Sequence, residues 1–160
     1  MKSKEEKTNA IRSLEQKKLQ FKVHDYSQSD AVNGMEVAQY LHENPDRVFK
    51  TLVTVGKSAG HYVFLVPVSR ELDLKKAAKA VNEKSIDMIK AKELLPLTGY
   101  IHGGCSPVGM KKFFPTVIDA SAENFDEIFY SGGKIGLQIE MSLSELQKII
   151  TYRLADISVS

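Results

Sequence analysis

The stretch from Gly103 to Gly109, GGCSPVG, contains the only cysteine of the chain, and His102 directly precedes it. A cysteine nucleophile requires a neighbouring base, a lowered thiol pKa and exposure to substrate. His102 is the best local base, but nothing else in the sequence indicates a Cys-His-Asn or Cys-His-Asp arrangement. A buried, unreactive cysteine is also the commoner case for this residue type. The sequence therefore leaves two interpretations of Cys105, a nucleophile or a bystander.

The backbone of the same loop is a second candidate for chemistry. Four glycines and one proline occur between Thr98 and Gly109, which predicts unusual backbone angles. Consecutive amides from Gly104 to Ser106 are suited to form a nest for an anion or a carbonyl oxygen. The spacing matches neither the dinucleotide-binding motif nor the phosphate-binding P-loop. A tight structural turn is the alternative interpretation.

Lys50 lies in the run RVFKTLVTV, which is rich in strand-forming residues. In a strand its side chain shares a face with Val48 and Leu52. A lysine with apolar neighbours on its own face must reach solvent, pair with an acid or line a cleft. The simplest interpretation is a lysine at a strand end that reaches solvent.

Two further features carry weaker signals. Ser131 ends a predicted strand beside a glycine pair, where ordinary hairpin chemistry is a sufficient explanation. The lysine pairs of the chain are scattered, and Lys111–Lys112 is the best candidate for a phosphate contact because it closely follows the glycine loop.

Composition excludes several classes of protein. The 160 residues carry a net charge of only +2, with 42% hydrophobic and 26% charged residues, which is typical of a globular domain and not of a polycationic nucleic-acid-binding protein. Any affinity for RNA must therefore come from a local basic patch. A single cysteine forms no intramolecular disulfide, and the four histidines lack metal-site spacing, so no metal or cofactor is expected. The charged N-terminus and the short apolar runs predict neither a signal peptide nor a membrane span, and we expect a cytoplasmic protein.

The elements that must position these residues are mixed in type. We expect helices over 8–20, over GMEVAQYLHE, over LDLKKAAKAVN, over AKELLPLTG until proline and glycine end it, and over SLSELQKII. The inner face of the LDLKKAAKAVN helix is expected to carry Leu74, Ala77, Ala78 and Val81. The predicted strands are FKVHDY, VFKTLVTVG, HYVFLVPV, SIDMI, TVIDA, EIFYS, KIGLQIE and ADIS. A further strand is expected over GYIHGG, where it leads into the glycine loop. GKSAG and GG have hairpin-turn composition, and Ser142 with Glu145 forms a capping box.

No regular alternation of strands and helices is present, and no linker divides the chain. The pattern predicts an α+β fold, a single domain over 1–160 with a mixed, mostly antiparallel, barrel-like β-sheet flanked by helices.

Five motifs occur in an order and spacing that resemble the YbaK/EbsC family of bacterial aminoacyl-tRNA deacylases: NPDRVFKTLV, LDLKKAAKAV, TGYIHGGCSPVGMKK, TVIDASA and FYSGGKIGLQIE. Each motif alone is modest, but five in order are specific, and the resemblance extends from about Leu19 to Asp156. The best-known members resemble Cys-tRNA(Pro) deacylases and are relatives of the editing domain inserted in bacterial prolyl-tRNA synthetase.

The resemblance implies a set of site residues. The essential lysine of the family corresponds to Lys50, and a tyrosine near the end of the first strand corresponds to Tyr26. The serine before the glycine pair corresponds to Ser131, and Gln138 lies where many members carry an acidic residue. The G-x-x-x-P loop, whose backbone holds the carbonyl region of the aminoacyl ester, corresponds to Gly103, Gly104, Cys105, Ser106 and Pro107. The segment SQSDAVNG is a second departure, because it lacks the family's aromatic residue and is short.

The resemblance also implies a mechanism without an enzyme nucleophile, because relatives often carry isoleucine at the position of Cys105. The cysteinyl thiol of the substrate attacks its own ester carbonyl, while the protein orients that carbonyl and stabilises the oxyanion. The implied partners are aminoacyl-tRNA, with tRNA(Pro) foremost, and prolyl-tRNA synthetase.

Three alternatives remain at this point. A related deacylase for another small amino acid, such as alanine, would use water as the nucleophile. A regulatory protein would keep the fold without turnover, although the presence of both Lys50 and the G-x-x-x-P loop argues against it. A redox or hydrolytic enzyme would be centred on Cys105.

Overall fold

The computed structural model describes residues 7–159. Within that range the helices are α1 (Asn9–Gln16), α2 (Gly34–Tyr40), α3 (Leu74–Ala80), α4 (Ala91–Thr98) and α5 (Leu143–Leu146), with the 3-10 helices η1 (Pro45–Arg47) and η2 (Ala120–Asn124). The strands are β1 (Lys22–Asp25), β2 (Phe49–Gly56), β3 (His61–Pro67), β4 (Glu71–Leu72), β5 (Ile86–Met88), β6 (Thr116–Asp119), β7 (Ile128–Ser131), β8 (Leu137–Met141), β9 (Tyr152–Ala155) and β10 (Ser158–Val159).

The strands form three sheets. A five-stranded sheet has the order β5-β2-β3-β6-β9, a three-stranded sheet has the order β1-β8-β7, and β10 pairs with β4. The pairs β3–β6 and β6–β9 are parallel, and the other pairs are antiparallel. The predicted α+β fold with a mixed, mostly antiparallel sheet is confirmed. The sheets do not close into a barrel, although a parallel bridge between Val48 and Phe129 joins β2 to β7 at one corner.

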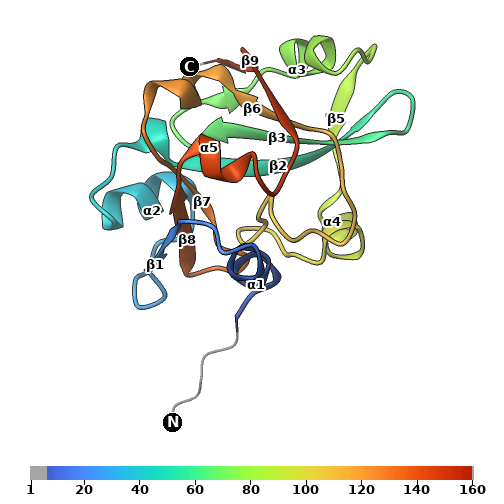
Figure 1. Ribbon diagram of the computed structural model, residues 1–160. Helices are drawn as coiled ribbons and strands as arrows, with labels where there is room; N and C mark the ends of the chain where they lie inside the picture. Colours follow the sequence, from blue (N-terminus) through green and yellow to red (C-terminus); the bar gives the residue numbers. More distant parts are fainter. Residues whose placement is uncertain (1–6, 160) are drawn as a thin grey trace.

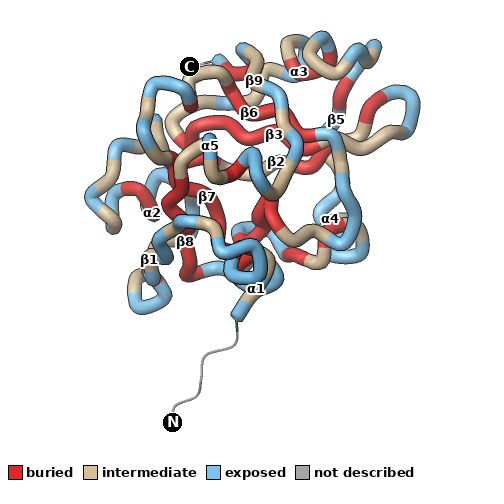
Figure 2. The backbone as a smooth tube through the Cα atoms, in the orientation of Figure 1, coloured by how far each residue is buried: buried red, intermediate tan, exposed pale blue. Residues whose placement is uncertain are grey.

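Both faces of the five-stranded sheet are covered, as the alternation of side chains along β3 requires. Val63 and Leu65 pack into a cluster with residues of β7, β8, α1 and α5, whereas Phe64 and Val66 pack against Ala77 and other residues beneath α3. Figure 1 shows α3 on one side of the sheet, with α1 and the three-stranded sheet on the other. The buried backbone of Figure 2 is concentrated in β2, β3, β6, β7 and β8, so these strands form the rigid frame of the molecule.

Several predicted elements end elsewhere. Helix α1 ends at Gln16, because Lys18 adopts a positive φ of 57° and turns the chain toward β1. The strand predicted over GYIHGG, directly before the glycine loop, is absent from the structure. The carbonyls of Thr98 and Ile101 there accept hydrogen bonds from the amides of Lys111 and Gly104 instead of from a neighbouring strand. Pro96 lies inside α4, and Gly99 alone ends that helix with a φ of 86°. Of the four residues predicted on the inner face of α3, Ala77 and Ala78 are buried and Val81 is partly buried, whereas Leu74 is exposed.

One predicted turn and one predicted cap also differ in detail. The hairpin from β2 to β3 is present, but the glycine pair is not a two-residue turn, because β7 and β8 are joined by the five residues 132–136. Ser142 caps α5 as expected by accepting a hydrogen bond from the Glu145 amide. The carboxylate of Glu145 accepts from the Gln20 amide instead of returning to Ser142, so the second half of the capping box is replaced by a tertiary contact.

Candidate functional site

A cleft of about 600 Å³ lies between the beginning of β2, the N-terminal half of α4, the glycine loop and the segment that enters α2. Six of the residues expected in the site line it, namely Tyr26, Lys50, Gly103, Cys105, Ser131 and Gln138. These residues come from five separate segments of the chain. Only the tertiary fold brings them together.

Lys50 reaches the cleft from the second residue of β2, where it pairs with Val66 of β3. Its Nζ lies 3.5 Å from Oε1 of Glu71 on β4, and the Glu71 side chain is 78% exposed. An ion pair this exposed contributes little to stability, because water screens it. The ammonium is thus held near the mouth of the cleft and is able to meet a substrate.

The glycine loop presents only part of itself to the cleft. Gly103 has a φ of +85°, which favours glycine, and it lines the cavity. Gly104 is buried, and a Cβ added there would lie 2.8 Å from the Cα of Lys134. Ser106 and Pro107 are buried behind the cleft, where the Ser106 hydroxyl accepts a hydrogen bond from the Val108 amide. Gly104, Ser106 and Pro107 therefore anchor the loop and do not line the cavity.

The expected nest of amides is only partly available. The Gly104 amide donates to the Ile101 carbonyl at 3.0 Å and so is already used within the turn. Within residues 7–159, the amides of Gly103 and Cys105 donate to no backbone carbonyl. Because Gly103 and Cys105 also line the cleft, their amides are better placed for an oxyanion contact than the Gly104 amide.

Cys105 lines the cleft but is poorly suited to be a nucleophile. The residue is buried, and burial raises the pKa of its thiol to about 12, an effect that a hydrogen bond with Thr98 only partly offsets. At neutral pH such a thiol is protonated, whereas nucleophilic attack requires the thiolate. His102 is exposed at the mouth of the cleft.

Strands β8 and β2 each contribute one unpaired polar atom to the cleft. Gln138 lies on β8, the central strand of its sheet, opposite Ser131 of β7. The Ser131 hydroxyl accepts a hydrogen bond from the Gly133 amide at 3.1 Å. The Gln138 Oε1 and the Thr51 hydroxyl are buried and have no hydrogen-bond partner within the described residues. Because an unpaired buried polar atom is costly, both atoms are suited to accept hydrogen bonds from a bound ligand.

Sequence reasoning missed several residues of the cleft. Thr51 directly follows Lys50, and strict alternation along a strand places neighbouring side chains on opposite faces. Both residues nevertheless line the cavity. The N-terminal part of α4, with Lys90, Ala91 and Leu94, also lines it. No local motif indicates these positions, because they reach the cleft only through the packing of α4 beside β2.

Two classes of feature are absent from the described range. Between residues 7 and 159, no three side chains of the histidine, cysteine or acidic type come close enough to hold a metal ion. None of the helices in that range has the length and apolar character needed to cross a lipid bilayer.

This fold is that of an aminoacyl-tRNA editing domain: the model of that family matches residues 29–149, and the chain belongs to the family. Over 158 residues the chain is 42% identical to the "Putative Cys-tRNA(Pro)/Cys-tRNA(Cys) deacylase EbsC" of Enterococcus faecalis (strain ATCC 700802 / V583), covering 98% of this chain and 96% of that protein. Predicted membership of the YbaK/EbsC family is thereby confirmed.

Solved structures agree with this assignment. A "putative trans-editing enzyme for prolyl tRNA synthetase" superimposes with a TM-score of 0.82 at 26% identity, over 95% of this chain and 96% of that one. The hypothetical protein APE2540 superimposes with a TM-score of 0.85 over 94% of this chain and 99% of that one, and at 22% identity this likeness concerns the fold alone.

Proposed function

We propose that this protein is an aminoacyl-tRNA deacylase that acts in trans on mischarged tRNA, in the first place on Cys-tRNA(Pro), in the cytoplasm and together with prolyl-tRNA synthetase. The observation that carries the proposal is the cleft of about 600 Å³, which gathers Lys50, the Gly103 backbone and the unpaired Gln138 oxygen in an editing-domain fold. The similarity to EbsC suggests the cysteinyl substrate.

The substrate supplies the nucleophile in the proposed reaction. The cysteinyl sulfur attacks its own ester carbonyl, a C–S bond forms, and the bond from the carbonyl carbon to the ribose oxygen breaks. The thiol proton passes to the ribose oxygen, so that tRNA and a cyclic thioester leave. No enzyme nucleophile is required, which agrees with the buried, protonated thiol of Cys105.

The protein contributes orientation and electrostatics. The Lys50 ammonium, together with the free amides of Gly103 and Cys105, stabilises the negative charge that develops on the ester oxygen. The Gln138 oxygen and the Thr51 hydroxyl accept hydrogen bonds from the α-ammonium of the aminoacyl group. These contacts hold the sulfur close to the carbonyl carbon, which favours ring closure.

The test is a deacylation panel. Cys-tRNA(Pro), Ala-tRNA(Pro) and Ser-tRNA(Pro) are incubated with the protein, each with and without prolyl-tRNA synthetase. We expect the cysteinyl ester to be cleaved fastest and the synthetase to raise the rate. Faster release of alanine would indicate attack by water and a different specificity, and the absence of release from every substrate would contradict a deacylase.

A further inference from the structure

The segment from Met88 to Phe113 has an excess of positive over negative charge that is larger than that of the whole chain. It contains four lysines, Lys90, Lys92, Lys111 and Lys112, and one acidic residue, whereas the whole chain has a net charge of only +2. All four lysines are exposed, and within residues 7–159 none of them forms an ion pair. The acidic residue, Glu93, is occupied because its carboxylate accepts the Lys90 amide at 3.1 Å.

These lysines follow α4 from the cleft outward. Lys90 precedes the first turn of α4 and lines the cleft. Lys111 lies at the other end, where its amide donates to the Thr98 carbonyl and its side chain packs over Gly99. The eight residues of α4 span about 12 Å, since each residue rises about 1.5 Å. The positive charges therefore form a path from the mouth of the cleft to Lys112.

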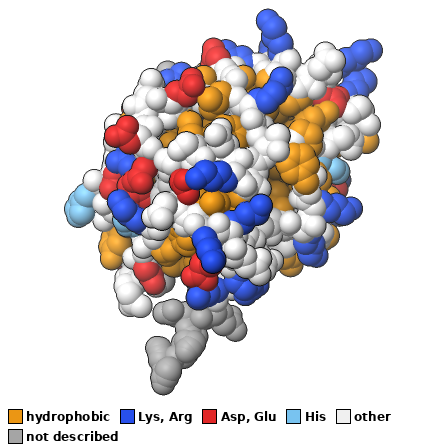
Figure 3. Space-filling model, in the orientation of Figure 1, with side chains coloured by type: hydrophobic (Ala, Val, Ile, Leu, Met, Phe, Trp, Pro, Cys, Tyr) orange, Lys and Arg blue, Asp and Glu red, His pale blue; other side chains and the backbone are white. Residues whose placement is uncertain are grey.

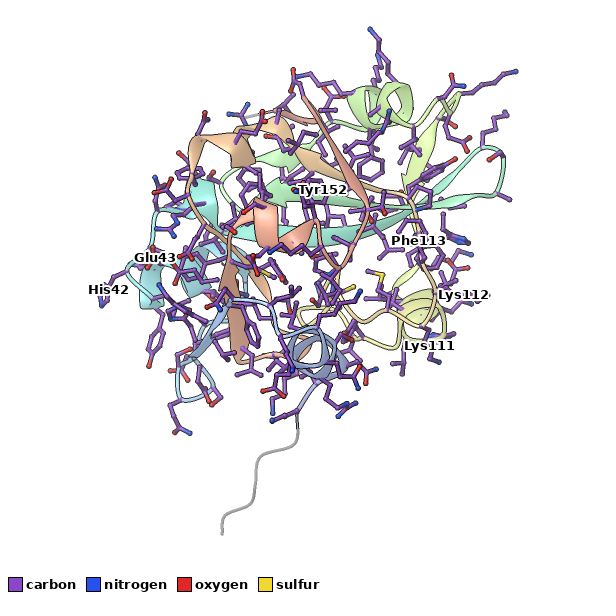
Figure 4. All side chains as sticks on the ribbon, viewed as in Figure 1. His42, Glu43, Lys111, Lys112, Phe113 and Tyr152 are labelled. Atoms are coloured by element: carbon purple, nitrogen blue, oxygen red, sulfur yellow. The ribbon has the colours of Figure 1, made fainter. Side chains whose placement is uncertain are left out.

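Exposed apolar side chains accompany the same path. Leu95 on α4 is 51% exposed, and Phe113, directly after the lysine pair, is 66% exposed. Figure 4 shows Lys111, Lys112 and Phe113 together on the side of the molecule where α4 lies, and Figure 3 shows basic side chains beside a hydrophobic area there. We call the surface of Lys90, Lys92, Leu95, Lys111, Lys112 and Phe113 the α4 ridge.

The opposite rim of the cleft has the other sign of charge. Val32 and Asn33 line the cleft on that side, and the exposed residues Asp30 and Glu36 flank them. An anionic chain that leaves the cleft is repelled from this rim and attracted to the α4 ridge.

We propose that the α4 ridge binds the acceptor strand of the tRNA substrate, an inference that rests on the proposed function. An ester bound in the cleft is covalently joined to a polyanion, so the strand must leave across one rim. Phosphates follow one another at about 3.4 Å along a stacked strand, so α4 runs beside about four of them. Lysines bind these phosphates, and Leu95 and Phe113 contact bases or ribose.

The test compares two charge-reversed variants of the full chain. Lys111→Glu/Lys112→Glu changes the ridge, and Lys75→Glu/Lys79→Glu makes the same charge change at exposed positions on α3 that form no ion pair with any residue from 7 to 159. Binding of uncharged tRNA(Pro) is measured by fluorescence anisotropy over a range of salt, and deacylation is measured with Cys-tRNA(Pro) and with cysteinyl-adenosine, which ends at the cleft.

We expect the ridge variant to bind tRNA(Pro) at least about tenfold more weakly and to reduce the slope of log affinity against log salt by about 1.4 for two lost phosphate contacts. KM for Cys-tRNA(Pro) rises, whereas cleavage of cysteinyl-adenosine is unchanged. Three results would overturn the proposal. The two variants could weaken tRNA binding equally, the ridge variant could lose equal activity on both substrates, or the wild type could show no salt-dependent binding of tRNA(Pro). Binding is read without catalysis, so a wild-type protein that binds tRNA but cleaves nothing would contradict the proposed function and not the ridge.

Discussion

Lys50 is the residue of the cleft whose ammonium we propose to stabilise the oxyanion. Replacing Lys50 by alanine is expected to lower the deacylation rate about 10²–10³-fold, because one preformed contact to the oxyanion is lost. The melting temperature should change little, since the ion pair with Glu71 is exposed. Single-turnover deacylation and thermal unfolding measure the two effects. Near-wild-type turnover by a folded Lys50→Ala protein would contradict the assignment, and Lys50→Arg tests whether a compact ammonium is required.

Cys105 should be dispensable for catalysis. Cys105→Ala is expected to retain most of the activity, because the buried thiol has a pKa of about 12 and is protonated at neutral pH. A modest loss of stability is expected, since a buried side chain becomes smaller. Iodoacetamide should likewise modify the native protein slowly near pH 7. A loss of rate as large as that of Lys50→Ala would restore the nucleophile interpretation.

Gln138 offers a case in which activity and stability move in opposite directions. Its Oε1 is buried without a partner, so Gln138→Leu removes an unsatisfied acceptor and should stabilise the protein by up to about 1 kcal/mol. The same change removes a predicted contact to the α-ammonium and should raise KM. Urea unfolding and steady-state kinetics on Cys-tRNA(Pro) check both effects, and an unchanged KM would place Gln138 outside the substrate site.

At the scale of elements, the glycine loop combines two different requirements. Gly103 has a positive φ and borders the cleft, whereas Gly104 is packed against the backbone of Lys134. Gly103→Ala adds about 1 kcal/mol of backbone strain and places a methyl group 3.3 Å from Ile135 beside the substrate. Gly104→Ala is the matched variant, because its added methyl group would push the loop away from the backbone of Lys134.

We expect Gly103→Ala to lose deacylation rate out of proportion to its stability. Gly104→Ala should mainly lower the melting temperature, whereas the deacylation rate of its folded fraction should be closer to the wild-type rate than that of Gly103→Ala. Thermal unfolding beside single-turnover kinetics separates the two variants. A Gly103→Ala protein that melts earlier but is fully active in its folded fraction would show a structural turn only.

At the scale of the whole molecule, Asp119 joins the central sheet to the C-terminal segment. Its carboxylate accepts hydrogen bonds from the Ser121 hydroxyl at 2.6 Å and from the Ile157 amide at 3.0 Å. Burial by itself raises the pKa of Asp119, but the hydrogen bonds from Ser121, Ile157 and Ser158 outweigh it and hold the pKa below its ordinary value of 3.8. The carboxylate therefore stabilises the fold fully above about pH 4, and this contribution declines as the pH falls through the lowered pKa.

Asp119→Asn should lower the free energy of unfolding by about 1.5–3 kcal/mol at pH 7, the usual value of hydrogen bonds to a charged group. The difference from wild type should shrink at about pH 3 and below. Urea unfolding at both pH values measures it, with Asp87→Asn as the control, because Asp87 is exposed on β5 and its side chain forms no hydrogen bond within residues 7–159. A difference that is independent of pH would refute the explanation.

Local patterns predicted the elements whose causes are local. The β-branched runs around Val53 and Val63 and the turn between them predict the central hairpin, and Ser142 predicts the start of α5. The errors came where tertiary contacts decide, as at Lys18, which ends α1 early, and at Gly132 and Gly133, which begin a longer connection. Pairing of β3 with β6 and of β6 with β9 has no local signature, because these strands are far apart in the sequence.

The sequence by itself determined the family, because five short motifs occur in it in the order and spacing of that family. Through that resemblance it also proposed Lys50 and the glycine loop as site candidates. Only the tertiary structure decided which of those residues share one cleft, because Lys50 and Gln138 lie on strands of two different sheets and Tyr26 directly follows β1, so that long-range packing alone brings them together. It also decided that the Gly104 amide is already occupied, that the Gln138 oxygen is unpaired, and that lysines lie on one rim of the cleft and acids on the other. Hydrogen-bond saturation and burial are properties of the whole packed chain, and no local pattern contains them.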